Sequence, residues 1–390
     1  MGYLTPYSID KESWPPRLAE ARDRILSGLG RLGAGVPKAF QAELVGTLEV
    51  VTSYYSNRME GNPTRIGDIF SAQEGHLAAT VAERNYQLEH MAHIQTAEKM
   101  RVALALNSAL SPASTGFIKM LHREFYGQLP DVMRIATTLR GETIPVIPGE
   151  LRIATVSVRL HHAVPVQQLE ACLSEFENAY APENSPSADK LMALAAAHHR
   201  FLWIHPFADG NGRVVRLMSE AMAIRCGVWG GGLYSISRGL ARRRKEYEAA
   251  LAGADAPRWN DLDGRGNLSL KGLLQFCEFF MDVMADQIEF MGSLLDMAQL
   301  QGRFARLLNV LRAEKKLSES ESAILSHLLR VGEMRRGDIQ KIAGVKARQA
   351  NKISSHLLKE GYVQSDSPKG TLRLKANREV VRGLFPEFYE

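Results

Sequence analysis

Apolar residues recur at helical spacing along most of this chain. Within residues 42–59 the apolar positions share one helical face, and they are Leu44, Leu48, Val51, Tyr55 and Met59. Similar runs with few helix-breaking residues predict further helices over residues 14–32, 75–106, 114–128, 165–180, 188–203 and 213–224. The pattern therefore predicts an all-α protein.

One segment departs from this pattern. Residues 130–166 are rich in Thr, Val, Ile, Pro and Gly, and residues 152–159 suit a short strand. A bare strand can pair with an extended peptide through main-chain hydrogen bonds, which places the peptide without demanding much of its sequence. We therefore expect a short β element within an otherwise helical chain.

The last 80 residues or so have a pattern of their own. A helix over residues 318–330 begins at Ser318, with Glu321 placed for a capping box, and two more helices follow over 336–343 and 346–360. Residues 362–364 and 371–374 then suit a hairpin. Three helices and a hairpin resemble a winged helix, and its third helix carries residue types that contact phosphates and base edges: Lys346, Arg348, Gln349, Asn351, Lys352 and Ser355. Winged helices also serve for protein contacts, so DNA binding and protein binding both stay open.

Composition restricts the class of protein and its expected location in the cell. The chain has 390 residues, of which 45% are hydrophobic and 23% charged, as in ordinary globular proteins, and no apolar run approaches the roughly 18 residues of a membrane span. No signal peptide is evident, and the three cysteines, Cys172, Cys226 and Cys277, have neither metal-site spacing nor an even number for disulfides. We expect a cytoplasmic protein. Its net charge is +5, and residues 311–390, with 16 Lys and Arg against 10 Asp and Glu, carry +6.

The most informative chemistry lies in residues 205–216, His-Pro-Phe-Ala-Asp-Gly-Asn-Gly-Arg-Val-Val-Arg. Gly210 and Gly212 precede a predicted helix, where free N–H groups and the helix dipole favour a phosphate. Arg213 and Arg216 share a face beside that helix terminus and suit phosphate oxygens. Asp209 can hold Mg²⁺ on the phosphates. His205 is the nearby side chain that can accept a proton near neutral pH.

This window resembles the signature of the Fic family, His-x-Phe-x-Asp/Glu-Gly-Asn-Gly-Arg-x-x-Arg. The matching positions are His205, Phe207, Asp209, Gly210, Asn211, Gly212, Arg213 and Arg216. Residues 149–152 and 155–158 look like the family's flap hairpin, and residues 237–251 look like the segment beyond the active-site helix. The resemblance spans roughly residues 40 to 300 and implies a helical Fic core with a short β-hairpin flap, which transfers AMP from ATP to a hydroxyl of a target protein.

A second motif resembles the family's inhibitory pattern, Ser/Thr-x-x-x-Glu-Gly/Asn, at Ser56, Glu60 and Gly61. Its position upstream of the first motif resembles the subclass that carries the inhibitory helix at the N-terminal side of the same chain. The resemblance implies that Glu60 binds Arg216 and occupies the place of the γ-phosphate. An exposed Glu at a helix C-terminus is the alternative interpretation. We thus expect an N-terminal helical region with this helix over 1–110, a catalytic core over 111–300 and a winged-helix-like domain over 311–390.

Other candidates are more ambiguous. The basic cluster Arg238, Arg242, Arg243, Arg244 and Lys245 is either a solvated helix face or an aid to nucleotide binding, and the resemblance points to Arg242. Tyr247 either covers the adenine or belongs to the core. The adjacent His198 and His199 point to different faces, which favours packing or surface roles over metal binding. Residues 261–267 look like a calcium loop but have Gly272 in place of its final glutamate, so we reject that reading.

The sequence therefore predicts a protein adenylyltransferase that uses ATP and Mg²⁺, with His205 as base and a protein hydroxyl as acceptor. Asn211 would orient the α-phosphate, and Phe207 would point into the core. Self-modification, a homodimer and DNA as a further partner remain open, and no membrane association is expected. Two alternatives stand beside it: use of another nucleotide diphospho compound, and an ATP-sensing transcription regulator that binds DNA. Transfer of the γ-phosphate is disfavoured, because the family branch that performs it departs from the Gly-Asn-Gly-Arg core present here.

Overall fold

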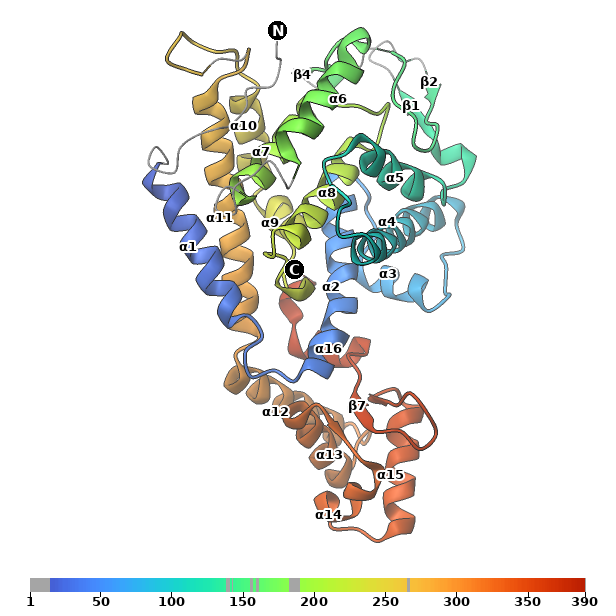
Figure 1. The fold of residues 1–390 in the computed structure, drawn as a ribbon. Coiled ribbons are helices and arrows are strands. Elements are labelled where there is room, and N and C mark those ends of the chain that lie inside the picture. Colours follow the sequence, from blue (N-terminus) through green and yellow to red (C-terminus); the bar gives the residue numbers. More distant parts are fainter. Residues whose placement is uncertain are drawn as a thin grey trace. The chain divides into compact units, whose positions relative to one another are not determined.

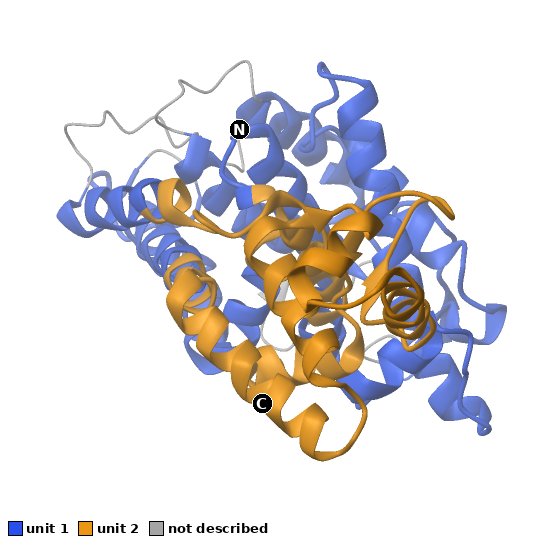
Figure 2. Cartoon of the chain, turned by 90° about the horizontal axis from the view of Figure 1, so that it is seen from below, with its two compact units in different colours: residues 1–27, 52–230, 235–287 blue, residues 28–51, 231–234, 288–390 orange. Residues whose placement is uncertain are grey.

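The computed structural model describes residues 15–137, 141, 143–154, 157–158, 161–181, 190–264 and 267–389. It is mostly helical, with three small antiparallel sheets in the described residues (Figure 1). The chain forms two compact units, coloured separately in Figure 2. Unit 1 contains residues 1–27, 52–230 and 235–287, and unit 2 contains residues 28–51, 231–234 and 288–390. The division falls within three helices: α1 (Pro16–Arg31), α2 (Lys38–Met59) and α11 (Leu270–Leu294).

Unit 1 is built around two consecutive helices. α7 (Lys190–Ile204) is buried at every residue from 191 to 201, as expected of a helix at the centre of a core. α8 (Asn211–Arg225) packs against α7 and also contacts α4, α5 and α9. The loop that joins α7 to α8 is therefore anchored at both ends in the core (Figure 1).

The remaining helices of unit 1 surround this pair. They are α3 (Ile66–Gln73), α4 (Val81–Leu106), α5 (Thr115–Tyr126), α6 (Val166–Tyr180), α9 (Ile236–Arg242) and α10 (Arg244–Ala254), with a 3-10 turn η2 (Asp131–Met133). Two hairpins lie in the same unit. β1 (Ile135–Thr137) pairs with β2 (Thr143–Pro145), and β3 (Ser157–Val158) pairs with β4 (His161–His162).

The C-terminal part of unit 2 consists of helices and a small sheet. Its elements are α12 (Met297–Ala313), α13 (Glu319–Val331), β5 (Glu333–Met334), η5 (Arg336–Asp338), α14 (Ile339–Ala343), α15 (Ala347–Lys359), β6 (Val363–Gln364), β7 (Leu372–Leu374), α16 (Arg378–Leu384) and η6 (Pro386–Phe388), with η4 (Gly230–Gly232) at the division. The strands form an antiparallel sheet in the order β5-β7-β6. The capping box predicted at the start of α13 is present, since Ser318 and Glu321 bond to each other's backbone N–H groups.

The mostly helical fold predicted from the sequence is confirmed. One predicted helix is wrong at its start: residues 75–80 are not helical, and α4 begins only at Val81. Gly75 has φ of +87° just beyond α3, and the Thr80 side chain caps α4 by accepting a hydrogen bond from the Glu83 N–H. Within the strand predicted over 152–159, Thr155, Val156 and Arg159 lie outside the described residues. The hairpin of β1 and β2 and the strand β5 were not predicted individually.

None of the helices in the described ranges combines the length and apolar composition needed to cross a membrane.

Candidate active site

The loop between α7 and α8 is closed by its own side chains. Phe207 is fully buried, as predicted, and its ring stacks on His122 of α5 with centroids 4.0 Å apart. The Asn211 side chain binds the Phe207 backbone twice: Oδ1 accepts from the N–H at 3.0 Å and Nδ2 donates to the carbonyl at 2.9 Å. The Asn211 side-chain amide thus holds the loop, and its expected role in orienting the α-phosphate stays a prediction.

His205 begins this loop in a rare backbone conformation. Its φ is +53°, a region that side chains other than glycine seldom occupy. Arg152 holds it there. The Nε of its side chain donates to the His205 carbonyl at 2.7 Å, and its backbone N–H donates to the Pro206 carbonyl at 3.0 Å. The same guanidinium donates to the carbonyls of Ala154 and Val164. Arg152 thus fastens the predicted flap segment to the histidine backbone.

Gly210 and Gly212 are both placed where a side chain would not fit. Gly210 caps α8 with φ of +80°, and a Cβ there would lie 2.5 Å from the Tyr126 ring. A Cβ on Gly212, in the first turn of α8, would lie 2.1 Å from Oε1 of Glu60. Because neither glycine has a side chain, Tyr126 packs against Gly210 and the Glu60 carboxylate lies against the first turn of α8, where a helix N-terminus favours an anion.

Asp209 lies at the edge of this helix start with its side chain 47% exposed. The Tyr126 hydroxyl donates to Asp209 Oδ2 at 2.7 Å, and an Arg213 nitrogen lies 3.4 Å from the same oxygen. Burial opposes the charge on Asp209, but Arg213 and the hydrogen bond from Tyr126 outweigh it, so the pKa of Asp209 is below its ordinary value. The carboxylate is ionised at neutral pH, as a metal ligand must be.

Arg213 is buried and already has several partners. Its nitrogens lie 3.4 Å from Glu89 Oε1 and 3.2 Å from the Tyr126 hydroxyl, and its guanidinium lies over the Phe125 ring, 4.8 Å from the centroid. Burial lowers the pKa of Arg213, but the surrounding anionic groups more than offset this and raise it. The charge on Arg213 is therefore fixed and contributes a positive field beside Asp209.

The predicted ion pair between Glu60 and Arg216 is present. Arg216 Nη2 donates to Glu60 Oε1 at 2.6 Å and to the Ser56 carbonyl at 2.9 Å, while its Nε donates to Ser56 Oγ at 2.8 Å. Burial opposes ionisation of Glu60, but Arg216 and Arg213 together hold its pKa below its ordinary value. Glu60 lies in the turn just beyond the end of α2 at Met59, and Gly61 follows it with φ of +93°.

Buried polar contacts fix the C-terminal end of α2, which carries Ser56 and leads into Glu60. Asn57 Nδ2 donates to His90 Nδ1 of α4 at 3.3 Å, and Ser53 Oγ lies 3.2 Å from the same nitrogen. Burial lowers the pKa of His90 to about 3, so this imidazole is neutral. The neutral ring thereby accepts from α2 and positions Ser56 and Glu60 toward α8.

The structure separates other candidates from this cluster. Arg242 is exposed, and no contact in the described residues links it to Arg216 or Glu60. Tyr247 belongs to the core: it is 4% exposed, and its hydroxyl lies 2.7 Å from Nε2 of the buried His198. His199 is also buried and pairs with Asp255. Their packing agrees with the predicted structural role of the two histidines.

Three residues of the site have no signal in the sequence motifs. Tyr126, Glu89 and His90 lie on α5 and α4, and each reaches the site only because these helices pack near α8 and the end of α2. Only the helical spacing of their segments was visible in the sequence.

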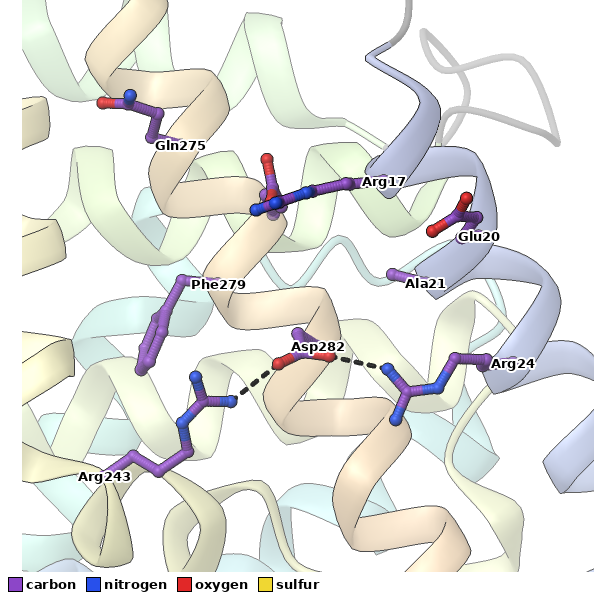
Figure 3. Close-up of a pocket in the computed structure, with 9 residues that line it drawn as sticks. Arg17, Glu20, Ala21, Arg24, Arg243, Gln275, Phe279 and Asp282 are labelled. Atoms are coloured by element: carbon purple, nitrogen blue, oxygen red, sulfur yellow. Dashed lines mark hydrogen bonds and ion pairs between the residues drawn. The ribbon is translucent and has the colours of Figure 1, made fainter.

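A separate cavity of about 610 Å³ in unit 1 contains none of these residues. Figure 3 shows that Arg24 of α1 and Arg243 both bond to Asp282 of α11, at 2.6 and 2.8 Å. Arg17 and Glu278 form a further pair on its wall. These charged groups neutralise one another, so the cavity gives no reason to move the candidate site away from α8.

Comparison with known proteins agrees with this site. Residues 112–223 match the Fic/DOC family, and this span covers the loop and nearly all of α8. The protein adenylyltransferase Fic of Culex quinquefasciatus is 26% identical over 211 residues, which cover 54% of this chain and 38% of that protein. The protein of the same name from Drosophila mojavensis is 32% identical over 107 residues, covering 27% of this chain and 21% of that protein. The chain thus matches well under half the length of these curated relatives.

Solved structures agree in fold. A Fic family protein from Desulfovibrio desulfuricans G20 has a TM-score of 0.57 at 17% identity, covering 96% of this chain and 99% of that one. A Fic domain containing signaling protein from Bacteroides thetaiotaomicron VPI-5482 has a TM-score of 0.52 at 20% identity, covering 71% and 96%. The fold is therefore the mostly helical Fic fold, and residues 112–223 of the chain match the Fic/DOC family.

Proposed function

We propose that this chain is a protein adenylyltransferase that transfers AMP from ATP to a Ser, Thr or Tyr hydroxyl of a target protein, and that Glu60 inhibits it. The observation that carries the proposal is the anionic Glu60 carboxylate, which lies against Gly212 in the first turn of α8 and is bound by Arg216 at 2.6 Å, where a phosphate could take its place. The family match supports the same chemistry.

In the proposed reaction the triphosphate lies over the backbone N–H groups at the start of α8, and Arg216 binds its distal phosphate. His205 accepts the proton of the target hydroxyl while that oxygen bonds to the α-phosphorus of ATP. The bond from the α-phosphorus to the bridging oxygen breaks, and pyrophosphate leaves with that oxygen. Positioning and electrostatic stabilisation supply most of the rate enhancement in phosphoryl chemistry.

Asp209 fits the role of a Mg²⁺ ligand. It is a half-exposed carboxylate held in its ionised form beside the anion site. Mg²⁺ is commonly bound by one or two protein carboxylates together with substrate phosphate oxygens and water, a role that a single Asp209 carboxylate can fill. When bound, the cation would neutralise charge that develops on the leaving pyrophosphate. Tyr126 and Arg213 hold the carboxylate in place for it.

Inhibition follows from competition for one position. The Glu60 carboxylate lies against Gly212 and takes up Arg216, the group proposed to bind the γ-phosphate. A nucleotide bound with its terminal phosphate on Arg216 would have to displace an ionised carboxylate. The chain in this conformation is therefore proposed to be the inhibited state.

We further propose that α13, α14, α15 and the three-stranded sheet of unit 2 form a winged helix. The support is the element order, with three helices followed by the β6–β7 hairpin, and the pairing of β5 with β7.

Transfer of label from ATP tests the catalytic proposal. The Glu60→Gly variant is incubated with cell lysate and ATP that carries radiolabel on the α-phosphate, and labelled proteins, including the chain itself, are separated and identified. We expect label on protein from α-labelled ATP and none from γ-labelled ATP. Label from the γ-position would instead identify a phosphotransferase, and competition by other nucleotides would define base specificity.

A second variant tests the role of His205. Glu60→Gly/His205→Ala should bind ATP with nearly the same dissociation constant as Glu60→Gly, and should transfer no AMP. Undiminished labelling by this double variant would remove His205 from the role of base.

A further inference from the structure

The exposed face of α15 is basic and also carries side-chain amides. Its other face, formed by Ala350, Ile353, Ser354 and Leu357, is buried, and α15 packs against α13, α14, η5 and β6. The exposed positions on or beside the helix carry basic and amide side chains: Lys346, Arg348, Gln349, Asn351, Lys352, Ser355 and Lys359. No acidic residue occurs between Lys346 and Lys359. This set is defined here as the α15 face.

The chain segment that contains the α15 face carries a net positive charge, although the Glu321 carboxylate of α13 also contacts α15, at His356. Residues 335–375 contain ten Lys and Arg against three Asp and Glu, a net charge of +7, so the rest of the chain, at +5 overall, sums to −2. Of the three acidic residues, Asp366 pairs with Arg373, and Glu360 lies 4.0 Å from Lys359. In the described residues Lys346, Arg348 and Lys352 have no ion-pair partner. The positive charge is therefore available to a polyanion.

The side chains of the α15 face indicate which kind of polyanion binds there. An acidic protein surface or a phosphate polymer would be satisfied by lysines alone. Gln349 and Asn351 add side-chain amides, which can read base edges in the major groove of B-DNA, and that groove admits one α-helix. Both amides lie in the first half of α15, the part of a recognition helix that reaches the bases. Lys369 adds a further exposed basic side chain, in the turn that joins β6 to β7.

We infer that unit 2 binds double-stranded DNA, with α15 in the major groove and Lys346, Arg348 and Lys352 contacting phosphates or bases. This activity is additional to AMP transfer and does not depend on it. Cation release from the phosphate backbone makes such binding steeply dependent on salt.

Fluorescence anisotropy of the full chain with a labelled 24-base-pair DNA duplex tests the inference. The α15 variant is Lys346→Gln/Arg348→Gln/Lys352→Gln. The control variant, Arg306→Gln/Arg312→Gln/Arg330→Gln, removes the same charge from exposed positions of α12 and α13. Thermal unfolding of both variants verifies that they are folded. Dissociation constants are measured at several salt concentrations between 50 and 200 mM.

We expect the α15 variant to bind DNA at least about tenfold more weakly than the parent, and its salt slope to fall by about 2 to 3, near one per lost phosphate contact. The control variant should stay within about threefold of the parent. Equal loss in both variants, or no binding of the parent at 50 mM salt, would overturn the inference. Equal binding of an RNA duplex of the same length would overturn it too, because the major groove of A-form RNA is too narrow for a helix.

Discussion

Glu60 and Gly212 are in direct contact at the start of α8, so close that a Cβ on Gly212 would lie 2.1 Å from the Glu60 carboxylate oxygen. A helix N-terminus attracts an anion, and here the anion is a side chain of the same chain. The Arg216 guanidinium completes the contact at 2.6 Å. Under the proposed function, this arrangement makes Glu60 a competitor for the position of a phosphate.

We therefore predict that Glu60→Gly raises the rate of AMP transfer about tenfold, a change of about 1.4 kcal/mol, because it removes the part-buried carboxylate that occupies Arg216. The dissociation constant for ATP should fall in parallel. Initial rates with α-labelled ATP and calorimetric titration of ATP measure the two quantities. A variant that transfers AMP no faster than the parent would contradict inhibition by Glu60.

Ser56 should contribute a smaller part of the same restraint. Ser56→Ala removes the acceptor that Arg216 Nε uses at 2.8 Å but leaves the Ser56 carbonyl and the Glu60 carboxylate in place. One such hydrogen bond contributes about 1 kcal/mol, so we predict roughly a fivefold rise in AMP transfer. In the Glu60→Gly background the same change should have almost no effect, because the restraint is already gone. Additive effects of the two substitutions would show instead that Ser56 acts independently of Glu60.

The sequence predicted features that depend on local residue patterns, but it did not predict contacts that depend on how the helices pack. Helical spacing predicted most helices, and the two motifs predicted the pair of Glu60 with Arg216, 156 residues apart. No motif marks Tyr126, which reaches Asp209 only because α5 packs against α8, beside the loop that joins α7 to α8. The helix predicted from residue 75 onward failed because the turn at Gly75 and the Thr80 cap outweigh the apolar pattern. The sequence did not reveal the two bonds from Asn211 to Phe207, because they depend on a loop shape that the sequence does not specify.

Acid should destabilise unit 1 through His90. Burial lowers the pKa of His90 to about 3, against about 6.5 for an unfolded histidine, so the folded state disfavours the proton. A depressed histidine pKa means that its stabilising contribution is complete above pH 6.5 and is lost as pH falls from 6.5 toward 3. Between pH 7.5 and pH 5 the linkage relation gives a loss of about 2 kcal/mol.

His90→Asn tests this pH dependence. The Asn oxygen can replace Nδ1 as acceptor for Asn57 but binds no proton in this range. We predict that the free energy of unfolding, measured in urea at pH 7.5 and pH 5, falls by about 2 kcal/mol more in the parent than in the variant. The same pH dependence in both proteins would assign the acid sensitivity to other groups, of which the buried His93 is the nearest candidate.

Tyr126 should determine how well the site binds Mg²⁺. Its hydroxyl donates to Asp209 at 2.7 Å and lies 3.2 Å from Arg213, while its ring packs against Gly210. Tyr126→Phe removes the two polar contacts and keeps the ring, so the loop should stay folded while Asp209 loses its fixed orientation. Groups that orient a metal ligand typically contribute about tenfold or more to metal affinity.

In the Glu60→Gly background we predict that Tyr126→Phe raises the Mg²⁺ concentration for half-maximal AMP transfer about tenfold and leaves ATP binding without metal nearly unchanged. Titration of Mn²⁺ by electron paramagnetic resonance measures the metal affinity of the ATP complex without relying on turnover. Tyr247→Phe is the matched control, since it removes a buried hydroxyl that bonds to His198 rather than to Asp209. If Tyr126→Phe and Tyr247→Phe shift the metal affinity alike, the effect is general loosening of the helical core. A shift confined to Tyr126→Phe would establish that the hydroxyl acts through the Asp209 carboxylate, because the two variants lose the same group from the same unit and differ in what it touches.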